Sequence, residues 1–214
     1  MYPKIQLTKS LCVASLVFLY LSCSNDSKIK ETKEPVRLSR SEFIKALSIE
    51  ALRYCKNNNY NSSLCFLLDM SVHSGKKRFF VWDLKQGKAI LSGLVSHGCC
   101  NNPWGTDKSK SNPVFSNSPE SHCTSLGKYK IGNPFISEWG IKKGYQLIGL
   151  EKTNSNAMRR QIVLHSWEDI PEKEPFPNGL PEGWGCPAVS NSFMKTLDYI
   201  IRDSKKPILI WIFR

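Results

Sequence analysis

Apolar side chains recur every three or four residues in two stretches of the chain, which is the spacing of one helical face. The first stretch ends at Cys55 and begins with Ser39 and Glu42, whose Ser-x-x-Glu spacing is typical of a capping box. The second runs from Asn191 to Asp203. The apolar positions are Ile44, Leu47, Ala51 and Tyr54 in the first stretch and Phe193, Leu197, Ile200 and Ile201 in the second. The pattern therefore predicts one helix near each end of the folded region.

Between these helices the apolar residues form short runs rich in β-branched and aromatic side chains, which favours strands. The runs cover 64–70, 79–84, 89–96, 145–150 and 162–164, and a last apolar run covers 208–213. Gly75-Lys76-Lys77 and Gln86-Gly87-Lys88 have the composition of hairpin connections, so we expect 64–96 to be a meander. The expected fold class is mainly β with flanking helices (α+β), in one domain over 39–214.

The first 38 residues have a different pattern. Leu11 to Ser22 is a run of twelve mostly apolar residues, preceded by lysines and followed by a polar stretch. These features predict a secretory signal peptide over 1–22. Cleavage at another bond and an uncleaved anchor are the alternatives. The apolar run is shorter than the roughly 18 residues of a membrane-spanning helix, so a multi-span membrane protein is excluded.

The junction Ser22-Cys23 resembles that of bacterial lipoproteins, in which the cysteine is lipidated and becomes the new N-terminus. Residues 23–38 are polar and charged, which is typical of a tether between a lipid and a folded domain. The resemblance implies an exported lipoprotein that is anchored to a membrane through Cys23 and faces the periplasm or cell envelope.

Composition and charge exclude several classes of protein and indicate the kind of partner. The hydrophobic fraction of 41% and the charged fraction of 22% are ordinary for globular proteins, which excludes collagen-like, coiled-coil and wholly disordered chains. Lys and Arg number 30 against 18 Asp and Glu, giving a net charge of +12 that favours polyanionic partners such as a cell wall. The alternative is a solvated basic surface, because the basic residues are scattered. We expect a monomer with no nucleic-acid partner, since no nucleic-acid motif is present.

The eight cysteines limit which disulfides and which reactive thiol the chain can have. Cys12 lies in the predicted signal and Cys23 at the lipidation site, which leaves Cys55, Cys65, Cys99, Cys100, Cys123 and Cys186. An oxidising compartment permits disulfides, and Cys100 with Cys123 or Cys55 with Cys65 are plausible pairs. If one of the six is a reactive thiol, at least one more is unpaired. A bond between the adjacent Cys99 and Cys100 is disfavoured by backbone strain.

One cysteine and one histidine have the surroundings of a catalytic pair. His165 ends the apolar run Ile162-Val163-Leu164, and Cys186 follows Gly185 in a turn. A nucleophilic thiol needs an imidazole that accepts its proton and keeps its pKa low. Glycine permits a tight turn whose amides point at a developing oxyanion. The alternative is a buried free cysteine and a core histidine.

The amino-acid sequences of these two segments resemble those of a known enzyme family. IVLHSW at 162–167, followed by GWGCPAVS at 183–190, resembles the active-site signature of L,D-transpeptidases of the YkuD-like fold, in particular the murein L,D-transpeptidase catalytic-domain branch. Upstream blocks at 81–84, 91–98, 115–117, 124–129 and 147–151 resemble that branch in the same order. The resemblance implies a β-sandwich or barrel that acts on peptidoglycan stem peptides as a cysteine acyltransferase. It implies no metal and no organic cofactor.

The same resemblance implies roles for single residues. Cys186 becomes the nucleophile, His165 its general base, and the backbone near Gly185 the oxyanion site. Gly183 stands where the family usually has Ser or Thr, so a supporting hydroxyl is missing. Ser166, next to His165, or a backbone carbonyl is then expected to orient the imidazole.

Substrate contacts are expected from several other positions. Arg159 and Arg160 fit an arginine that the branch carries before the histidine strand, and a guanidinium suits a substrate carboxylate; the alternative is a paired surface arginine. The resemblance places His97 near the substrate groove. Ser116 and Asn117 line a loop beside that groove, and Trp184 adjoins the nucleophile.

Other interpretations rank lower. His97, Cys99, Cys100, His122 and Cys123 offer five ligands for zinc, but their spacing matches no structural zinc pattern. The tryptophans Trp104, Trp139, Trp167 and Trp184 are more often packing residues than sugar platforms. Two alternative functions remain: a sortase-like or other cysteine acyltransferase or hydrolase, and a non-catalytic lipoprotein that binds peptidoglycan on the same scaffold.

Overall fold

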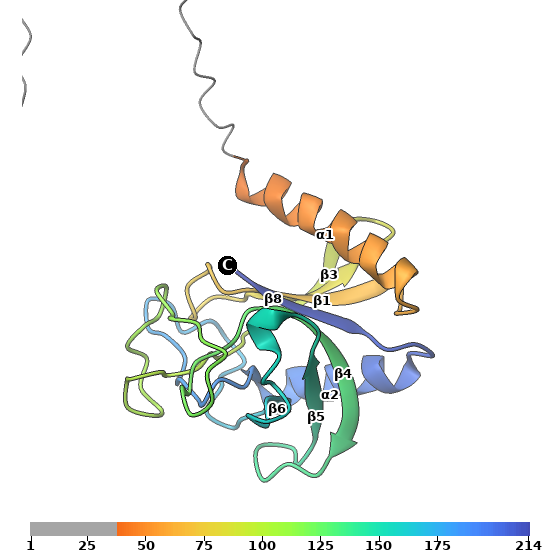
Figure 1. The fold of residues 1–214 in the computed structure, drawn as a ribbon. Helices are drawn as coiled ribbons and strands as arrows, with labels where there is room; N and C mark the ends of the chain where they lie inside the picture. Colours follow the sequence, from red (N-terminus) through yellow and green to blue (C-terminus); the bar gives the residue numbers. More distant parts are fainter. Residues whose placement is uncertain (1–37) are drawn as a thin grey trace, which may run out of the picture. The chain divides into compact units, whose positions relative to one another are not determined.

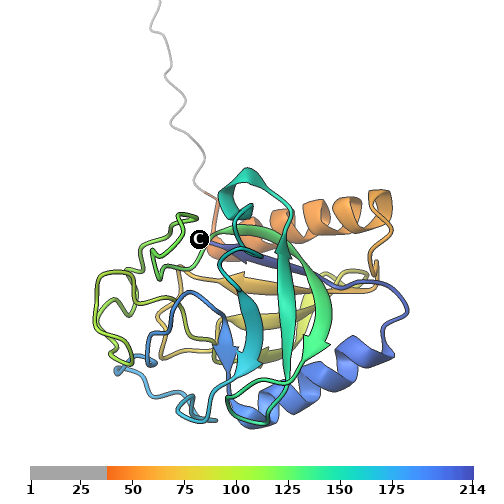
Figure 2. The same ribbon diagram turned by 60° about the horizontal axis from the view of Figure 1, so that its bottom comes forward.

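A mixed sheet of eight strands forms the centre of the computed structural model, which describes residues 38–214 (Figure 1). The strands are β1 (Leu64–Asp69), β2 (Phe79–Asp83), β3 (Lys88–Gly93), β4 (Gly127–Phe135), β5 (Gly144–Gly149), β6 (Val163–Ser166), β7 (Ala188–Val189) and β8 (Leu209–Phe213). Their order in the sheet is β3-β2-β1-β8-β4-β5-β6-β7. The pairs β1–β8 and β6–β7 are parallel and the others antiparallel. The sheet curls around a core, so the predicted mainly β fold class is confirmed (Figure 2).

Two helices flank the sheet, as predicted. Helix α1 (Arg40–Asn57) begins at the predicted capping box, in which the Ser39 hydroxyl accepts from the backbone of Glu42 and the Glu42 carboxylate accepts from the backbone of Ser39. Helix α2 (Asn191–Asp203) has the predicted bounds, and a single 3-10 turn, η1 (Lys152–Asn154), follows β5. The two helices lie on opposite sides of the curled sheet (Figure 2). None of the helices within 38–214 has the length and hydropathy to span a membrane.

The core lies in two layers. Inside the curled sheet, α2 buries Met194 and Leu197 against residues such as Phe66, Tyr129 and Leu147. Outside it, α1 packs Leu47, Ala51 and Cys55 on Leu209 and Phe213 of the central strand β8. Burial of these apolar side chains stabilises the fold by about 25 cal/mol per Å² of apolar surface removed from water. The last strand is buried on both faces apart from Trp211, as its apolar run predicts.

One predicted disulfide is absent from the described chain. Cys55 and Cys65 are free thiols and are both fully buried between α1 and the sheet. Burial raises the pKa of Cys55 to about 11 and that of Cys65 well above its ordinary value. The proposed Cys55–Cys65 pair is therefore wrong, because both side chains pack as small apolar groups.

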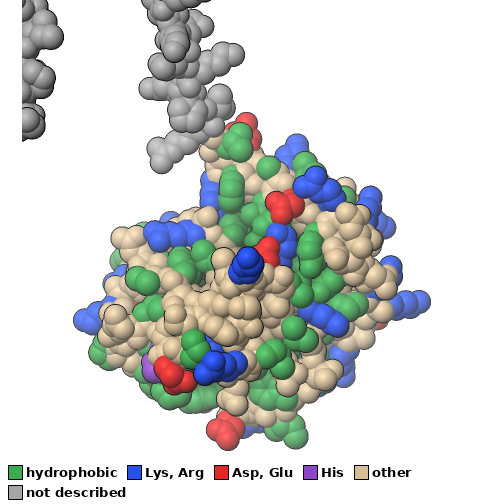
Figure 3. Space-filling model, viewed as in Figure 1, with side chains coloured by type: hydrophobic (Ala, Val, Ile, Leu, Met, Phe, Trp, Pro, Cys, Tyr) green, Lys and Arg blue, Asp and Glu red, His purple; other side chains and the backbone are tan. Residues whose placement is uncertain are grey.

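Some sequence-based expectations lie outside the described residues. The signal peptide over 1–22, the lipidation of Cys23 and nearly all of the tether over 23–38 fall there. Within the described part, lysines and arginines are scattered over the face shown in Figure 3 and do not form one stripe.

Candidate active site

The pairing of β6 with β7 brings His165 and Cys186 into one region. In the parallel register His165 lies opposite Ala188, and Cys186 precedes Ala188 by two residues. The backbone N–H of Val163, two residues before His165, donates to the Cys186 sulfur at 3.4 Å. Val163 and His165 are alternate residues of β6, so their side chains lie on the same face of the strand.

His165 is held by its own strand. Its Nδ1 lies 3.0 Å from the backbone carbonyl oxygen of Ser166. A carbonyl only accepts, so Nδ1 carries the proton and a neutral ring keeps Nε2 free as an acceptor. Burial lowers the pKa of His165, while the Ser166 carbonyl and the Glu168 carboxylate act in the opposite direction. The imidazole is therefore neutral near neutral pH, with the tautomer that a general base requires.

Cys186 is half-buried. Burial raises the pKa of the thiol, and the Val163 N–H and the positive charge of Arg160 oppose that increase. Within residues 38–214, no hydrogen bond joins the Cys186 sulfur to His165; its own S–H points to the carbonyl of Gln161, at 3.7 Å. Desolvation is therefore the largest effect on the pKa of the thiol in this resting arrangement.

The backbone before Cys186 turns at a glycine with a positive φ. Gly185 has φ +99°, in the region that side chains with a Cβ rarely adopt. In the described chain, no protein group accepts a hydrogen bond from the amide of Gly185 or of Cys186. Two neighbouring N–H groups thus remain available for a developing negative charge.

The two candidate arginines lie in different surroundings. Arg160 donates to the backbone carbonyls of Ser116, at 2.9 Å, and Cys123, and lies 3.4 Å from the Ser125 hydroxyl. Its guanidinium is close enough to Cys186 to lower the pKa of the thiol. Arg159 is exposed. Arg160 therefore braces the loops around Cys186, whereas the charge of Arg159 lies in solvent.

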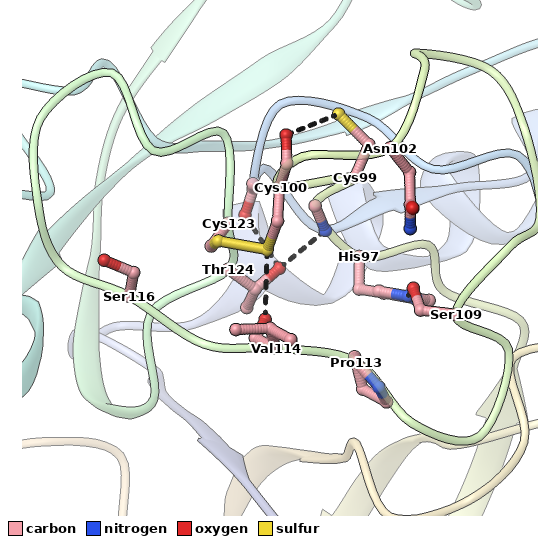
Figure 4. The surroundings of a disulfide bond; sticks show 12 residues. His97, Cys99, Cys100, Asn102, Ser109, Pro113, Val114, Ser116, Cys123 and Thr124 are labelled. Atoms are coloured by element: carbon pink, nitrogen blue, oxygen red, sulfur yellow. Dashed lines mark hydrogen bonds between the residues drawn. A yellow bond between two sulfur atoms is a disulfide. The ribbon is translucent and has the colours of Figure 1, made fainter.

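Cys123, whose carbonyl accepts from Arg160, belongs to a disulfide, which Figure 4 shows. Cys100 and Cys123 are bonded, as one of the predicted pairs, and Cys99 is a free, buried thiol, so the adjacent cysteines do not bridge. The next residue, Thr124, accepts from the Gly98 amide at 3.0 Å and donates to the Gly185 carbonyl at 3.2 Å. Since the bond occupies two of the five candidate zinc ligands and no metal-binding cluster occurs within 38–214, the zinc interpretation is dropped.

His97 belongs to a buried chain of polar groups. Arg78 donates to His97 Nδ1 at 2.8 Å, so the neutral ring donates from Nε2 to the Ser109 hydroxyl at 2.9 Å. Ser109 donates in turn to Glu182 at 2.8 Å. Burial and the charge of Arg78 lower the pKa of His97 to about 3. Only 1% of the His97 surface is exposed. His97 therefore supports the loop before Cys186 and does not present its ring to a substrate.

The remaining predicted residues are dispersed around the site. Asn117 binds the 3-10 turn through the carbonyl of Lys152, at 3.0 Å, and accepts from the amide of Asn156. The hydroxyl of Ser166 accepts from the Ile141 amide and is fully buried, so only its carbonyl reaches His165. Trp184 is 62% exposed and stacks on His122, with ring centroids 5.3 Å apart.

Sequence reasoning missed three residues that hold the site together. Arg78 and Glu182 are fully buried charged side chains, and nothing in a single sequence separates them from surface charges. Thr124 lies in one of the blocks that resemble the family, which was a signal, but its bond to Gly185 depends on the fold.

Two glycines give a matched prediction. A Cβ at Gly185 would lie 2.5 Å from the Cys123 carbonyl oxygen, whereas a Cβ at Gly183 meets only Trp167, at 4.0 Å. We expect Gly185→Ala to lower the rate of thiol acylation by at least about tenfold, because the nucleophile loop must shift. Gly183→Ala should stay within about twofold of wild type, since the site is open. Equal losses in both variants, measured by stopped-flow acylation, would contradict this geometry.

Comparison with known proteins agrees with the family resemblance seen in the sequence. A family model described as an L,D-transpeptidase catalytic domain matches residues 37–211. No curated protein matches the chain.

Solved structures show only distant similarity. The helical cell shape determining protein Pgp2 from Campylobacter jejuni is 13% identical, with a TM-score of 0.41, over 78% of this chain and 54% of that one. Bd1075 from Bdellovibrio bacteriovorus is 18% identical, with a TM-score of 0.41, over 70% and 48%. A structure described as the Ldtfm–avibactam carbamoyl enzyme is 13% identical, with a TM-score of 0.42, over 71% and 49%. The chain thus spans about half the length of these proteins.

Proposed function

Because the chain belongs to the L,D-transpeptidase catalytic domain family, we propose that it is a cysteine-dependent acyltransferase that acts on peptidoglycan stem peptides. Cys186 is the nucleophile of this proposal and His165 its general base. The observation that carries it is the β6–β7 register, which places the Cys186 sulfur 3.4 Å from the Val163 amide on the strand that presents His165.

The reaction begins from a neutral thiol and a neutral imidazole. Substrate binding brings the scissile carbonyl, between an L-centre and a D-amino acid, next to Cys186. Nε2 of His165 takes the thiol proton as the sulfur attacks the carbonyl carbon, and the amides of Gly185 and Cys186 donate to the oxyanion. The gap between sulfur and ring in the free protein is compatible with this step, since catalytic hydrogen bonds often tighten only in the complex.

Collapse of the tetrahedral intermediate breaks the bond to the D-amino acid. The imidazolium of His165 returns its proton to the leaving amine, and a thioester on Cys186 remains. An amine of a neighbouring stem, an amine of a protein or water then attacks the thioester. The first acceptor gives a cross-link and the last gives L,D-carboxypeptidase activity.

Substrate recognition in this proposal uses the exposed groups around the nucleophile. Arg159 offers an exposed guanidinium to a substrate carboxylate, and Trp184 offers an exposed ring beside Cys186. Arg160 and the Ser116–Asn117 loop act as supports. The proposal needs no cofactor, and a peptidoglycan substrate places the enzyme in the cell envelope, where lipidation at Cys23 would anchor it.

The product identifies the reaction and its acceptor. Wild-type protein incubated with a purified disaccharide tetrapeptide is expected to release the terminal D-amino acid, and mass spectrometry of the muropeptides distinguishes a tripeptide from a cross-linked dimer. No release of the D-amino acid from either a free or a disaccharide-linked tetrapeptide by the folded protein would refute the proposed function.

The pKa of His165 predicts the acid side of the pH profile. Burial lowers this pKa from its ordinary value of 6.5, so the ring loses its proton at lower pH and is available as a base below 6.5. We therefore expect kcat/KM for the tetrapeptide to fall only below pH 6.5, since this parameter reports the free enzyme. An acid limb with its midpoint above 6.5 would contradict the described environment of His165.

A second candidate function is supported by two observations within residues 38–214. The raised pKa of Cys186 and its lack of a bond to His165 also suit a protein that binds peptidoglycan without catalysis. If this function is correct, the wild-type and Cys186→Ala proteins bind sacculi equally well, and neither releases a D-amino acid.

A further inference from the structure

Three tryptophan rings from separate parts of the chain are in contact. Trp104, on the loop between β3 and β4, stacks on Trp167, with centroids 5.0 Å and planes 26° apart. Trp139, on the loop between β4 and β5, lies 6.0 Å from both. We call the Trp104 and Trp139 rings, supported by Trp167, the tryptophan platform.

The platform is exposed although its support is buried. Trp167 has 4% of its surface exposed, whereas Trp104 has 46% and Trp139 has 41%. Trp104 thus rests on a buried ring, and both outer rings keep a large area in solvent. Adjacent exposed aromatic rings of this size are unusual in a monomer and mark interaction sites.

The platform adjoins the nucleophile loop. Trp167 follows His165 by two residues, and a Cβ on Gly183 would lie 4.0 Å from the Trp167 ring. The loop that carries Trp104 is bonded to the same segment, since the Gly105 amide donates to the Glu182 carbonyl at 2.9 Å. A substrate on Cys186 therefore has the tryptophan platform at one side of its path.

We propose that the tryptophan platform binds an N-acetylated sugar ring of the glycan strand to which the stem peptide is attached. The inference rests on the proposed function, because that function requires a substrate with a covalently linked glycan. Tryptophan faces suit the C–H faces of pyranose rings, and the supported Trp104 ring needs no reordering to receive one.

The length of the stem limits how far its sugar can lie from Cys186. Three extended peptide residues span at most about 11 Å, which is the scale of the stem between the scissile carbonyl and the sugar. Gly183, three residues before Cys186, faces the Trp167 ring on which Trp104 stacks. The proposal therefore requires that the stem extend from Cys186 along this segment toward Trp104.

Binding can be tested apart from catalysis. The Cys186→Ala protein is titrated with the β-1,4-linked tetramer of N-acetylglucosamine, with tryptophan fluorescence as the readout. We expect saturable quenching, and a dissociation constant at least about tenfold higher after Trp104→Ala or Trp139→Ala. Tyr199→Ala is the matched control, because Tyr199 is an exposed aromatic residue, 67% exposed, on α2.

The catalytic protein gives the second readout. Rates are compared on a free tetrapeptide and on the same peptide linked to its disaccharide. The tryptophan platform predicts that Trp104→Ala and Trp139→Ala lower the ratio of linked to free rates by at least about tenfold, and that Tyr199→Ala leaves this ratio unchanged.

The outcomes separate the two proposals. Saturable binding of the tetramer that is weakened by both tryptophan variants supports the tryptophan platform. If neither peptide is turned over in that case, only the proposed function is refuted. No quenching by the tetramer, or equal losses on the linked and free peptides, overturns the platform. Dimerisation of wild type that is abolished by both variants would assign the rings to a second copy of the chain and would also overturn it.

Discussion

The Cys186→Ala variant is expected to lose the release of the D-amino acid from a tetrapeptide by at least about 10³-fold, because the reaction proceeds through a bond to the sulfur. The fold should be little affected, since the side chain is half-buried and its removal leaves the β6–β7 pairing intact. The measurement is a single-turnover assay by mass spectrometry on protein whose thermal unfolding matches wild type.

Another free cysteine provides the control for this variant. Cys55 is a fully buried thiol on the face of α1 that packs against the sheet, and it takes no part in the site. Cys55→Ala should lower the unfolding temperature, because a buried side chain is truncated, and keep the activity of the remaining folded protein. An active Cys186→Ala protein would refute the assignment of the nucleophile.

The Arg78→Met variant is expected to lose about 3–5 kcal/mol of unfolding free energy, because removing one partner of a buried charged network leaves the other uncompensated. Arg78 is fully buried and donates to His97, at 2.8 Å, and to the Val72 and Val95 carbonyls. Burial lowers its pKa to about 9, so it remains charged near neutral pH and compensates the buried carboxylates of Asp69 and Glu182.

Urea unfolding measures this loss, and the neighbouring residue is the control. Lys77 is exposed, so Lys77→Met should change the unfolding free energy by less than about 0.5 kcal/mol. If the Arg78 variant were as stable as the Lys77 variant, the buried network would not support the loop before Cys186.

Most of the fold could be predicted from local pattern, and the exceptions have physical causes. Both helices and the meander were visible as periodic apolar positions. Strand β4 was missed because Gly132 and Pro134 interrupt its alternation, although Tyr129 and Ile131 face the core. Strand β7 has two residues, too few for a pattern, and exists because β6 pairs with it.

The candidate site was predictable in part. The residues in the two motifs, His165 and Cys186, are brought together by a parallel pairing that the sequence pattern did not include. The buried bonds of Arg78, Glu182 and Thr124 depend on tertiary contacts between distant loops, so no local signal reveals them. The direction of the Cys186 pKa shift could not be predicted from sequence either, because desolvation depends on the packing around the thiol.

Intact-protein mass spectrometry with a carbapenem tests the central claim most directly. The lactam carbonyl is an acyl donor for an activated thiol, so wild-type protein should gain the mass of one drug molecule and Cys186→Ala should gain none. An adduct on both proteins would contradict Cys186 as the acylated residue. Absence of an adduct on folded wild type, together with no turnover of a tetrapeptide, would contradict the catalytic account.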